Sequence, residues 1–374
     1  MKIVVLKETA AHERRVALSP DVAKKFIESG HQVYIEKNAG KESGFLNEDY
    51  ENAGCVSEKE KSKLLDKADV FLTVSPLSES DIGKIPENSI VIGMLKPYQN
   101  KPLLKKLATK KITSFSLELL PRITRAQTMD VLSSQSNLSG YKAVVKAAFL
   151  FGRPFPLMMT AAGTVPAARV LVLGAGVAGL QAIATARRLG AIVSAFDVRT
   201  AAKEQVESLG ATFISVDSTE TGDGSGGYAS EMGDDYKKAQ AQKLLDTLKT
   251  QDIVITTAQI PGKPAPILIT DEMLKNMKPD SIIIDLATET GGNCVGAEHG
   301  KTVVKHDVKI VGPFNMPSLV ANSASQLYAR NLLNFFKILQ PNDTAPITIN
   351  WDDEIIKSTA LTHQGAIVHP NFKE

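Results

Sequence analysis

The sequence predicts an α/β protein with two doubly wound, Rossmann-like domains and a cleft between them. Short apolar, β-branched runs alternate with helical patterns along most of the chain, which is typical of parallel sheets covered by helices. The 374 residues are enough for two domains with separate cores. A glycine-rich strand–turn–helix–strand unit stands near the middle of the chain, at residues 169–199.

This central unit reads RVLVLGAGVAGLQAIATARRLGAIVSAFDVR and carries G-x-G-x-x-G at Gly174, Gly176 and Gly179. The order of strand, turn, helix, strand and acid is typical of a dinucleotide-binding βαβ unit. Gly174 permits a tight turn, Gly176 lets the backbone approach a pyrophosphate, and Gly179 lets the helix pack against the strand. The helix N-terminus would then bind the pyrophosphate. Asp197 would accept hydrogen bonds from the adenosine ribose and disfavour NADP.

The first domain is expected at residues 1–133 plus 317–374, and the second at 134–316 with the nucleotide site. Ser19 is expected to cap the first helix, which has Pro20 at its first position and ends at Gly30. The tail is expected to pack back on the first domain because its large apolar residues need burial. Those residues are Ile347, Ile349, Trp351 and Ile355.

The expected strands of the first domain are 3–6, 32–36, 70–74, 90–95 and 112–117, and its expected helices are 21–29, 58–67 and 101–110. The second domain is expected to contain strands at 170–173, 192–196, 212–216, 253–257 and 282–286, and a β-rich piece at 302–311. The polar start of 121–151 leads into a long helix, and 318–339 is a second long helix.

The segment 217–236, DSTETGDGSGGYASEMGDDY, contains five glycines and no lysine or arginine. It buries too little apolar surface to hold one shape by itself. One interpretation is a disordered surface insertion. The other is a mobile loop that closes on the nucleotide, with glycine hinges and with Tyr228 and Met232 as apolar contacts.

Composition excludes several functional classes. The net charge of +2 gives no reason to expect a nucleic-acid partner. Cys55 and Cys294 have no metal-ligand spacing, so no metal site is predicted, and so few thiols favour a reducing compartment. No apolar run approaches the roughly 18 residues of a membrane span, so no direct membrane insertion is expected.

Several blocks together resemble one family. They are RAQTMDVLSSQSNLSGY, MMTAAGTVPAARVLVLGAGVAGLQAIATARRLGA, TTAQIPGKPAP, IIIDLATETGGNC and GAIVHP. The resemblance is to the NAD(H)-binding component, or domain I, of proton-translocating nicotinamide nucleotide transhydrogenase, in the alpha subunit. The start KETAAHERRVALSP also resembles alanine dehydrogenase, a relative with the same two-domain architecture. The chain has no membrane helices, and it therefore looks like the form in which this component is a separate peripheral subunit.

The resemblance implies roles for individual residues. Arg122, Gln127, Asp130 and Ser133 match a catalytic loop that orients the nicotinamide carboxamide and ribose. The alternative for the first and third of these is a surface ion pair. The implied cofactor-binding set comprises Gln127, Thr128, Met129, Asp130, Gly174, Gly176, Val177, Gly179, Asp197, Val198, Arg199, Gly227, Tyr228 and Gln259.

The resemblance also implies an enzyme with partners: a Si/Re-specific NAD(P)+ transhydrogenase. NAD(H) would bind this chain, NADP(H) would bind a partner component, and a membrane-spanning component would carry the protons. Hydride would pass directly from one nicotinamide to the other. The chain is expected to form a homodimer and to lie in the cytoplasm, peripherally on the inner face of the cytoplasmic membrane.

Two other functions remain open. An alanine dehydrogenase-like oxidoreductase needs a general acid/base and a cation for the substrate carboxylate. Val74 stands where that family has a lysine, and VIGMLKPYQN lacks the family's histidine, whereas Arg15 remains. Direct hydride transfer between nicotinamides needs no such groups, which favours the transhydrogenase. The third possibility is a non-catalytic NAD(H)-binding module that only docks a partner.

Overall fold

The structure, a computed structural model, describes residues 1–374 except 67, 217–221, 223–231, 261, 343–345 and 374. The chain divides into two compact units. The first unit comprises Met1–Gln135 and Pro317–Glu374, and the second comprises Ser136–Met316.

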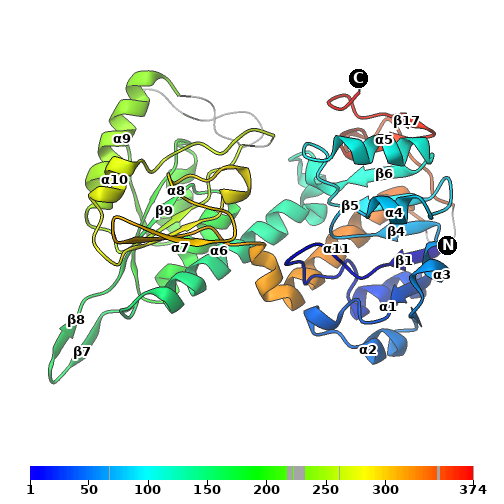
Figure 1. Cartoon of the computed structure of the whole chain (residues 1–374), viewed down its shortest axis with the longest axis horizontal. Helices are drawn as coiled ribbons and strands as arrows, with labels where there is room; N and C mark the ends of the chain where they lie inside the picture. The colour runs from blue at the N-terminus through cyan, green and yellow to red at the C-terminus, as the bar shows by residue number, and fades with distance from the viewer. Residues whose placement is uncertain (67, 217–221, 223–231, 261, 343–345, 374) are drawn as a thin grey trace. The chain divides into compact units, whose positions relative to one another are not determined.

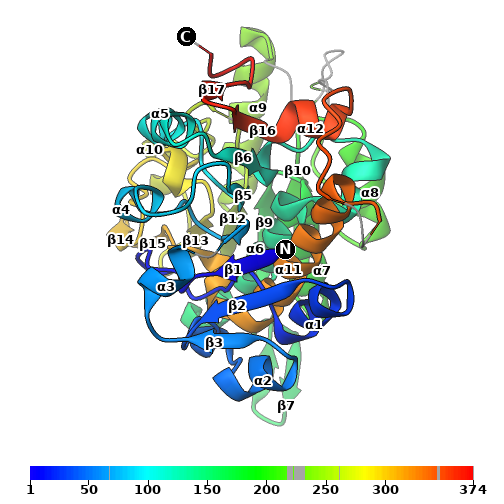
Figure 2. The ribbon, with the colours of Figure 1, turned by 90° about the vertical axis from the view of Figure 1, so that its right-hand side faces the viewer.

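The first unit is built on an eight-stranded sheet with the order β17-β16-β6-β5-β4-β1-β2-β3. The strands from β6 to β3 pair in parallel, and β16 and β17 add an antiparallel edge from the tail. Figure 2 shows β6, β5, β1, β2 and β3 following one another across this unit. The strands are β1 (Lys2–Val5), β2 (Gln32–Glu36), β3 (Val56–Glu58), β4 (Val70–Leu72), β5 (Ile90–Gly93), β6 (Thr113–Ser116), β16 (Ala360–His363) and β17 (Ala366–Ile367).

Helices cover both faces of this sheet. One core contains apolar side chains of α1, α11 and α12, and the other contains those of α3, α4 and α5. The sheet is therefore buried on both sides, as its β-branched strands require. The helices are α1 (Pro20–Glu28), α2 (Asn47–Asn52), α3 (Lys61–Leu65), α4 (Glu79–Ile82), α5 (Lys101–Thr109), α11 (Ala321–Leu339) and α12 (Glu354–Thr359).

The second unit has a seven-stranded sheet with the order β11-β10-β9-β12-β13-β15-β14. Its strands are parallel except for the edge strand β14. They are β9 (Arg169–Leu173), β10 (Ile192–Phe196), β11 (Thr212–Phe213), β12 (Ile253–Thr256), β13 (Ile282–Asp285), β14 (Thr302–Lys305) and β15 (Val308–Val311).

Two layers of helices also cover this second sheet. One face packs against α6 (Val131–Leu150), α7 (Val177–Arg188) and α8 (Ala202–Ser208). The opposite face packs against α9 (Asp234–Leu248) and α10 (Asp271–Lys275). The strand order turns back on itself beside β9, which places the loop after β9 at a topological switch point, the usual ligand position in open α/β sheets.

Several expectations about local structure were wrong. Ser19 precedes α1, but its hydroxyl donates to the Asp21 carboxylate, so it does not accept a helix N–H. The region around 158–165 forms a two-stranded hairpin, β7 (Met158–Thr160) and β8 (Gly163–Val165), that extends away from the sheet of the second unit (Figure 1). Trp351 remains 37% exposed, with its ring centroid 4.6 Å from that of His363.

Candidate nucleotide site

The glycine turn after β9 is fixed by close backbone contacts. Gly174 has φ +98°, a conformation that favours glycine, and a Cβ there would lie 2.6 Å from Thr257 Oγ1. A Cβ on Gly179 would lie 1.8 Å from the carbonyl oxygen of Gly174. Both positions therefore exclude any side chain, for reasons internal to the fold.

Gly176 differs from the other two glycines. Its backbone is extended, with φ −77° and ψ −168°, and a Cβ built on it meets nothing within 4 Å. It directly precedes α7, whose first residue Val177 is 41% exposed. The first N–H groups of a helix have no intrahelical acceptors and carry the positive end of its dipole. Open space at such a helix start fits a phosphate group.

Asp197 directly follows β10 and is only 8% exposed. Its Oδ2 accepts the Ala175 N–H at 2.7 Å, which ties the carboxylate to the glycine turn. Arg199 donates its backbone N–H and Nε to Oδ1, each at 2.9 Å, and its Nη2 to Oδ2 at 2.7 Å. The acid thus lies beside the turn, and its nearest cationic partner is Arg199. Val198, between the two, is partly buried.

Three residues that the sequence analysis did not single out organise this turn. The Thr257 hydroxyl donates to the Gly174 carbonyl at 3.0 Å. Asn293 is fully buried, accepts the Ala258 N–H at 3.0 Å and donates to the Ala258 carbonyl at 2.9 Å. A Cβ on Gly140 would lie 2.0 Å from the carbonyl of Ala178, so α6 can pass the start of α7 only with glycine there. Their presence in TTAQIPG, TGGNC and NLSGY was the only signal in the sequence.

The remaining nucleotide candidates of the second unit are less informative. Gln259 is exposed, and its Nε2 donates to the Leu286 carbonyl at 3.1 Å. Gly227 and Tyr228 lie outside the described residues, as does most of the segment 217–236. Met232, which does lie within the described part of that segment, is 8% exposed.

The loop with Arg122, Gln127 and Thr128 belongs to the first unit. It contains a short 3-10 helix, Thr124–Met129, and all three side chains are exposed. Two asparagines of α11, Asn331 and Asn334, donate to the Thr128 carbonyl at 2.8 and 3.0 Å. The backbone of the loop is therefore held in place while the side chain of Gln127 remains accessible.

Further contacts hold both ends of this loop. Arg125 makes a two-pronged ion pair with Asp353, with both N···O distances 2.7 Å. Asp130 caps α6 by accepting the Ser133 N–H at 2.9 Å, and the Ser133 hydroxyl also donates to its carboxylate. Met129 is 5% exposed and packs in the core of the first unit.

Arg15, the candidate cation for a substrate carboxylate, is 7% exposed. Its Nε and Nη2 donate to Glu13 at 2.8 and 2.6 Å, and its Nη1 donates to Gln135 at 2.9 Å. Burial alone would raise the pKa of Glu13, but the hydrogen bonds and charge of Arg15 lower it to about 2. Arg15 is therefore the partner of a permanently ionised carboxylate.

The strand end at Val74, where a dehydrogenase would carry its lysine, is occupied by protein contacts. The Glu8 carboxylate accepts the N–H groups of Val74 and Ser75 at 2.7 and 3.2 Å. Burial, with a smaller contribution from the charge of Glu13, raises the pKa of Glu8 to about 7. The buried Tyr328 hydroxyl donates to the Thr73 carbonyl at 2.7 Å.

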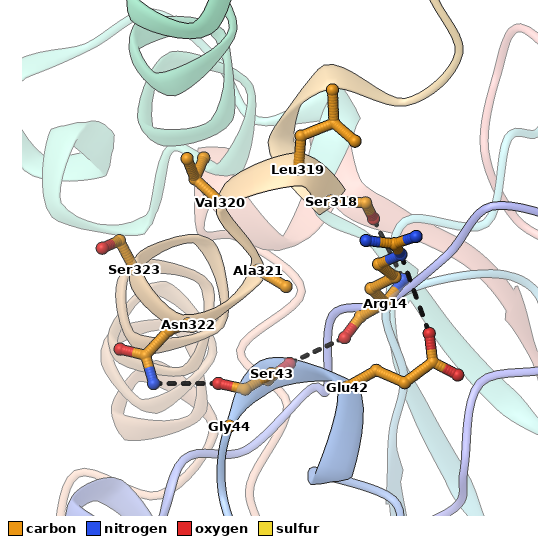
Figure 3. A pocket seen from close by; sticks show the side chains of 10 residues that line it. All are labelled: Arg14, Glu42, Ser43, Gly44, Ser318, Leu319, Val320, Ala321, Asn322 and Ser323. Carbon is orange, nitrogen blue, oxygen red and sulfur yellow. Dashed lines mark hydrogen bonds and ion pairs between the residues drawn. The ribbon is translucent and has the colours of Figure 1, made fainter.

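A pocket of about 410 Å³ lies elsewhere in the first unit, at the start of α11 (Figure 3). Its polar groups hold the loop at 42–44: Asn322 donates to the Ser43 carbonyl at 2.8 Å, and the Ser43 hydroxyl donates to the Arg14 carbonyl at 2.7 Å. The exposed Arg14 side chain lies 3.8 Å from the Glu42 carboxylate. These contacts are structural, and we assign no ligand to this pocket.

Within the portion of the chain that the structure describes, no group of His, Cys, Asp and Glu side chains has the arrangement of a metal site. Both cysteines are buried free thiols. Among the described residues, no helix combines the length and the apolar character that crossing a membrane requires.

Comparison with known proteins places this site in a family. The N-terminal domain model of alanine dehydrogenase/PNT matches residues 4–139, and the C-terminal domain model matches residues 143–370. The protein therefore has the two-domain architecture of nicotinamide nucleotide-dependent oxidoreductases of this type. The chain belongs to the alanine dehydrogenase/PNT family.

Individual relatives narrow this assignment. The chain is 51% identical over 377 residues to the first portion of NAD(P) transhydrogenase subunit alpha of Rhodospirillum rubrum, covering 99% of this chain and 98% of the relative. The crystal structure of transhydrogenase from Sinorhizobium meliloti matches with a TM-score of 0.87 at 46% identity, covering 99% of this chain and all of that chain. An L-alanine dehydrogenase shares the fold, with a TM-score of 0.80 at 22% identity, covering 100% of this chain and 98% of that chain.

These matches confirm the predicted α/β fold with two Rossmann-like domains. They also confirm the predicted resemblance to the transhydrogenase alpha subunit, with alanine dehydrogenase as a more distant relative. The chain is thus homologous to the NAD(H)-binding component of a multi-subunit transhydrogenase.

Proposed function

We propose that this chain binds NAD(H) and takes part in direct, Si/Re-specific hydride transfer to or from NADP(H) held by a partner component. Bound NADH supplies the hydride in the forward direction. The observation that carries the proposal is the glycine turn at 174–179. Two of its glycines are required by backbone contacts, whereas Gly176 faces open space at the start of a helix. A turn built only for packing would not need a glycine at that third position.

The chain's own groups have distinct tasks in this proposal. The first N–H groups of α7, beginning at Val177, bind the pyrophosphate, and Asp197 binds the adenosine ribose. Arg122 and Gln127 hydrogen-bond the nicotinamide carboxamide, because a guanidinium and an amide offer the necessary donors and acceptor. Asp130 and Ser133 hold the ribose end of the nicotinamide and fix the start of α6. The exposed side chains of Arg122 and Gln127 and the anchored backbone at Thr128 support these tasks.

The same structure gives no support to alanine oxidation. That reaction needs a cation for the substrate carboxylate and a group that transfers protons. Arg15 is buried and bonded to Glu13 and Gln135, and Val74 is an apolar residue that is 1% exposed. Transfer between two nicotinamides takes up no proton at the reacting carbons, so orientation and exclusion of water suffice.

The proposal includes the partners of the family. NADP(H) binds a separate component, a membrane-spanning component moves the protons, and this chain lies peripherally on the inner face of the cytoplasmic membrane. We also propose a homodimer. The β7–β8 hairpin supports it, because Leu157, Met158 and Met159 are 58%, 46% and 79% exposed. A two-stranded hairpin with exposed apolar side chains gains stability from burial against another surface.

Calorimetric titration with NADH and NADPH tests the nucleotide aspect of this proposal. We expect NADH to bind and NADPH to bind at least tenfold more weakly, since the carboxylate of Asp197 opposes a 2′-phosphate. In parallel, the chain is mixed with L-alanine and NAD+, and absorbance at the NADH band is followed. Formation of pyruvate and NADH would instead establish the dehydrogenase, and failure to bind NADH would refute the proposal.

A further inference from the structure

The nucleotide site contains an acid and a cation of opposite preference, two residues apart. An acid at the end of the second strand of a Rossmann unit favours the ribose hydroxyls of NAD, whereas an arginine near that position accommodates the 2′-phosphate of NADP. Asp197 and Arg199 supply both. They are ion-paired at 2.7 Å, with side chains only 5% and 20% exposed.

The pair uses the acceptor capacity of the carboxylate. Asp197 accepts four hydrogen bonds from described residues, one from Ala175 and three from Arg199. An ionised carboxylate offers about four lone-pair sites. The guanidinium in turn faces the acid with both Nε and Nη2, the two-pronged geometry with which arginine also binds phosphate.

We propose that Asp197 selects against NADP(H) chiefly by holding Arg199, and that Arg199 is a masked binding group for a 2′-phosphate. This inference rests on the nucleotide site proposed above. Direct repulsion between the carboxylate and a phosphate is weakened by the adjacent guanidinium, because the ion pair is close to neutral as seen from outside. The stronger effect is the loss of Arg199 as a donor while it is bonded to the acid.

The Asp197→Asn substitution separates these effects with little disturbance. The asparagine side chain has nearly the same shape, and its oxygen still accepts the Ala175 N–H that ties it to the glycine turn. It has no charge, so it no longer holds the guanidinium in an ion pair. Arg199 then remains beside the positive end of α7 as a binding group for a dianionic phosphate.

The test measures dissociation constants of NADH and NADPH by calorimetry for the wild-type chain, Asp197→Asn, Arg199→Gln and the double variant. Charge-assisted hydrogen bonds lead us to expect that Asp197→Asn binds NADPH on the order of tenfold more tightly than the wild type. Arg199→Gln alone should bring no gain. In the double variant the gain should be lost, and NADPH affinity should return to about the wild-type level.

Equal NADPH binding by Asp197→Asn and the double variant would overturn the inference, because the gain would then come from removal of the negative charge alone. No gain in Asp197→Asn with NADH binding retained would also overturn it. Asp197→Ser carries the same expectation, and thermal denaturation identifies any variant that fails to fold. Absence of NADH binding by the wild-type chain would instead refute the proposed function, so the two failures are distinguishable.

Discussion

Gly176 and Gly179 are three residues apart, yet alanine should have opposite effects at the two positions. At Gly179 the new Cβ would lie 1.8 Å from the Gly174 carbonyl oxygen, a backbone atom that cannot move without opening the turn. We expect Gly179→Ala to lower the free energy of unfolding by about 3 kcal/mol, at the upper end for overpacking. Nucleotide binding should be lost with the turn.

At Gly176 the fold has no objection to a side chain. Its extended backbone suits alanine, and no atom lies within 4 Å of the added Cβ. Gly176→Ala should leave stability unchanged or raise it by about 0.5 kcal/mol through the unfolded state. The Cβ would nevertheless occupy the space through which a pyrophosphate approaches. A steric cost of about 2 kcal/mol corresponds to roughly a thirtyfold increase in the dissociation constant of NADH.

The assay pairs urea denaturation with NADH titration for both variants. Gly152→Ala is the matched control, because Gly152 is exposed in the same unit and also has nothing within 4 Å of an added Cβ. It should change neither quantity. Wild-type NADH affinity in Gly176→Ala would refute the pyrophosphate site. A loss of stability in Gly176→Ala as large as that in Gly179→Ala would show that the turn is structural.

Three further predictions concern other regions of the chain. Gln127→Asn and Asp130→Asn should each slow hydride transfer in the assembled complex more than they weaken NADH binding, and equal losses in rate and affinity would show that the loop only binds. The pKa of Glu8 is raised from 4.5 to about 7, so the folded state binds this proton more tightly than the unfolded state, and the free energy of unfolding should fall by up to about 3 kcal/mol as pH rises from 4.5 past 7. Denaturation of Glu8→Gln at pH 5 and pH 8 should show a smaller fall than the wild type, and an identical fall in both proteins would contradict this assignment. Met159→Lys should shift the molar mass measured by light scattering toward that of a monomer, and an unchanged dimer would exclude the hairpin from the interface.

Local sequence patterns predicted the main elements of the sheets because buried parallel strands are short, continuous apolar runs. The strands β9, β10, β12 and β13 lie within or within one residue of the runs assigned to them, with fully buried positions throughout β12 and β13. The β7–β8 hairpin escaped prediction because its residues are mostly exposed and show no alternation of apolar and polar side chains. The contribution of the tail as edge strands depends on contacts with β6, some 250 residues earlier in the sequence.

At the candidate site, the sequence indicated the type of turn but not the state of its side chains. The G-x-G-x-x-G spacing and the position of Asp197 are local properties of the chain. That Arg199 bonds to this acid depends on rotamers, which no spacing reveals. The burial of Arg15 depends on Gln135, 120 residues away, so its retention in the sequence was ambiguous until the fold was known.

The most direct test of the account is reconstitution of hydride exchange. The purified chain is mixed with NADH and an oxidised NADP analogue, with and without the NADP(H)-binding component, and reduction of the analogue is followed by absorbance. We predict rapid exchange only when the partner component is present, and a slower rate with Gln127→Asn. Tight NADH binding without any exchange in the complete mixture would contradict the transhydrogenase assignment and leave a binding module.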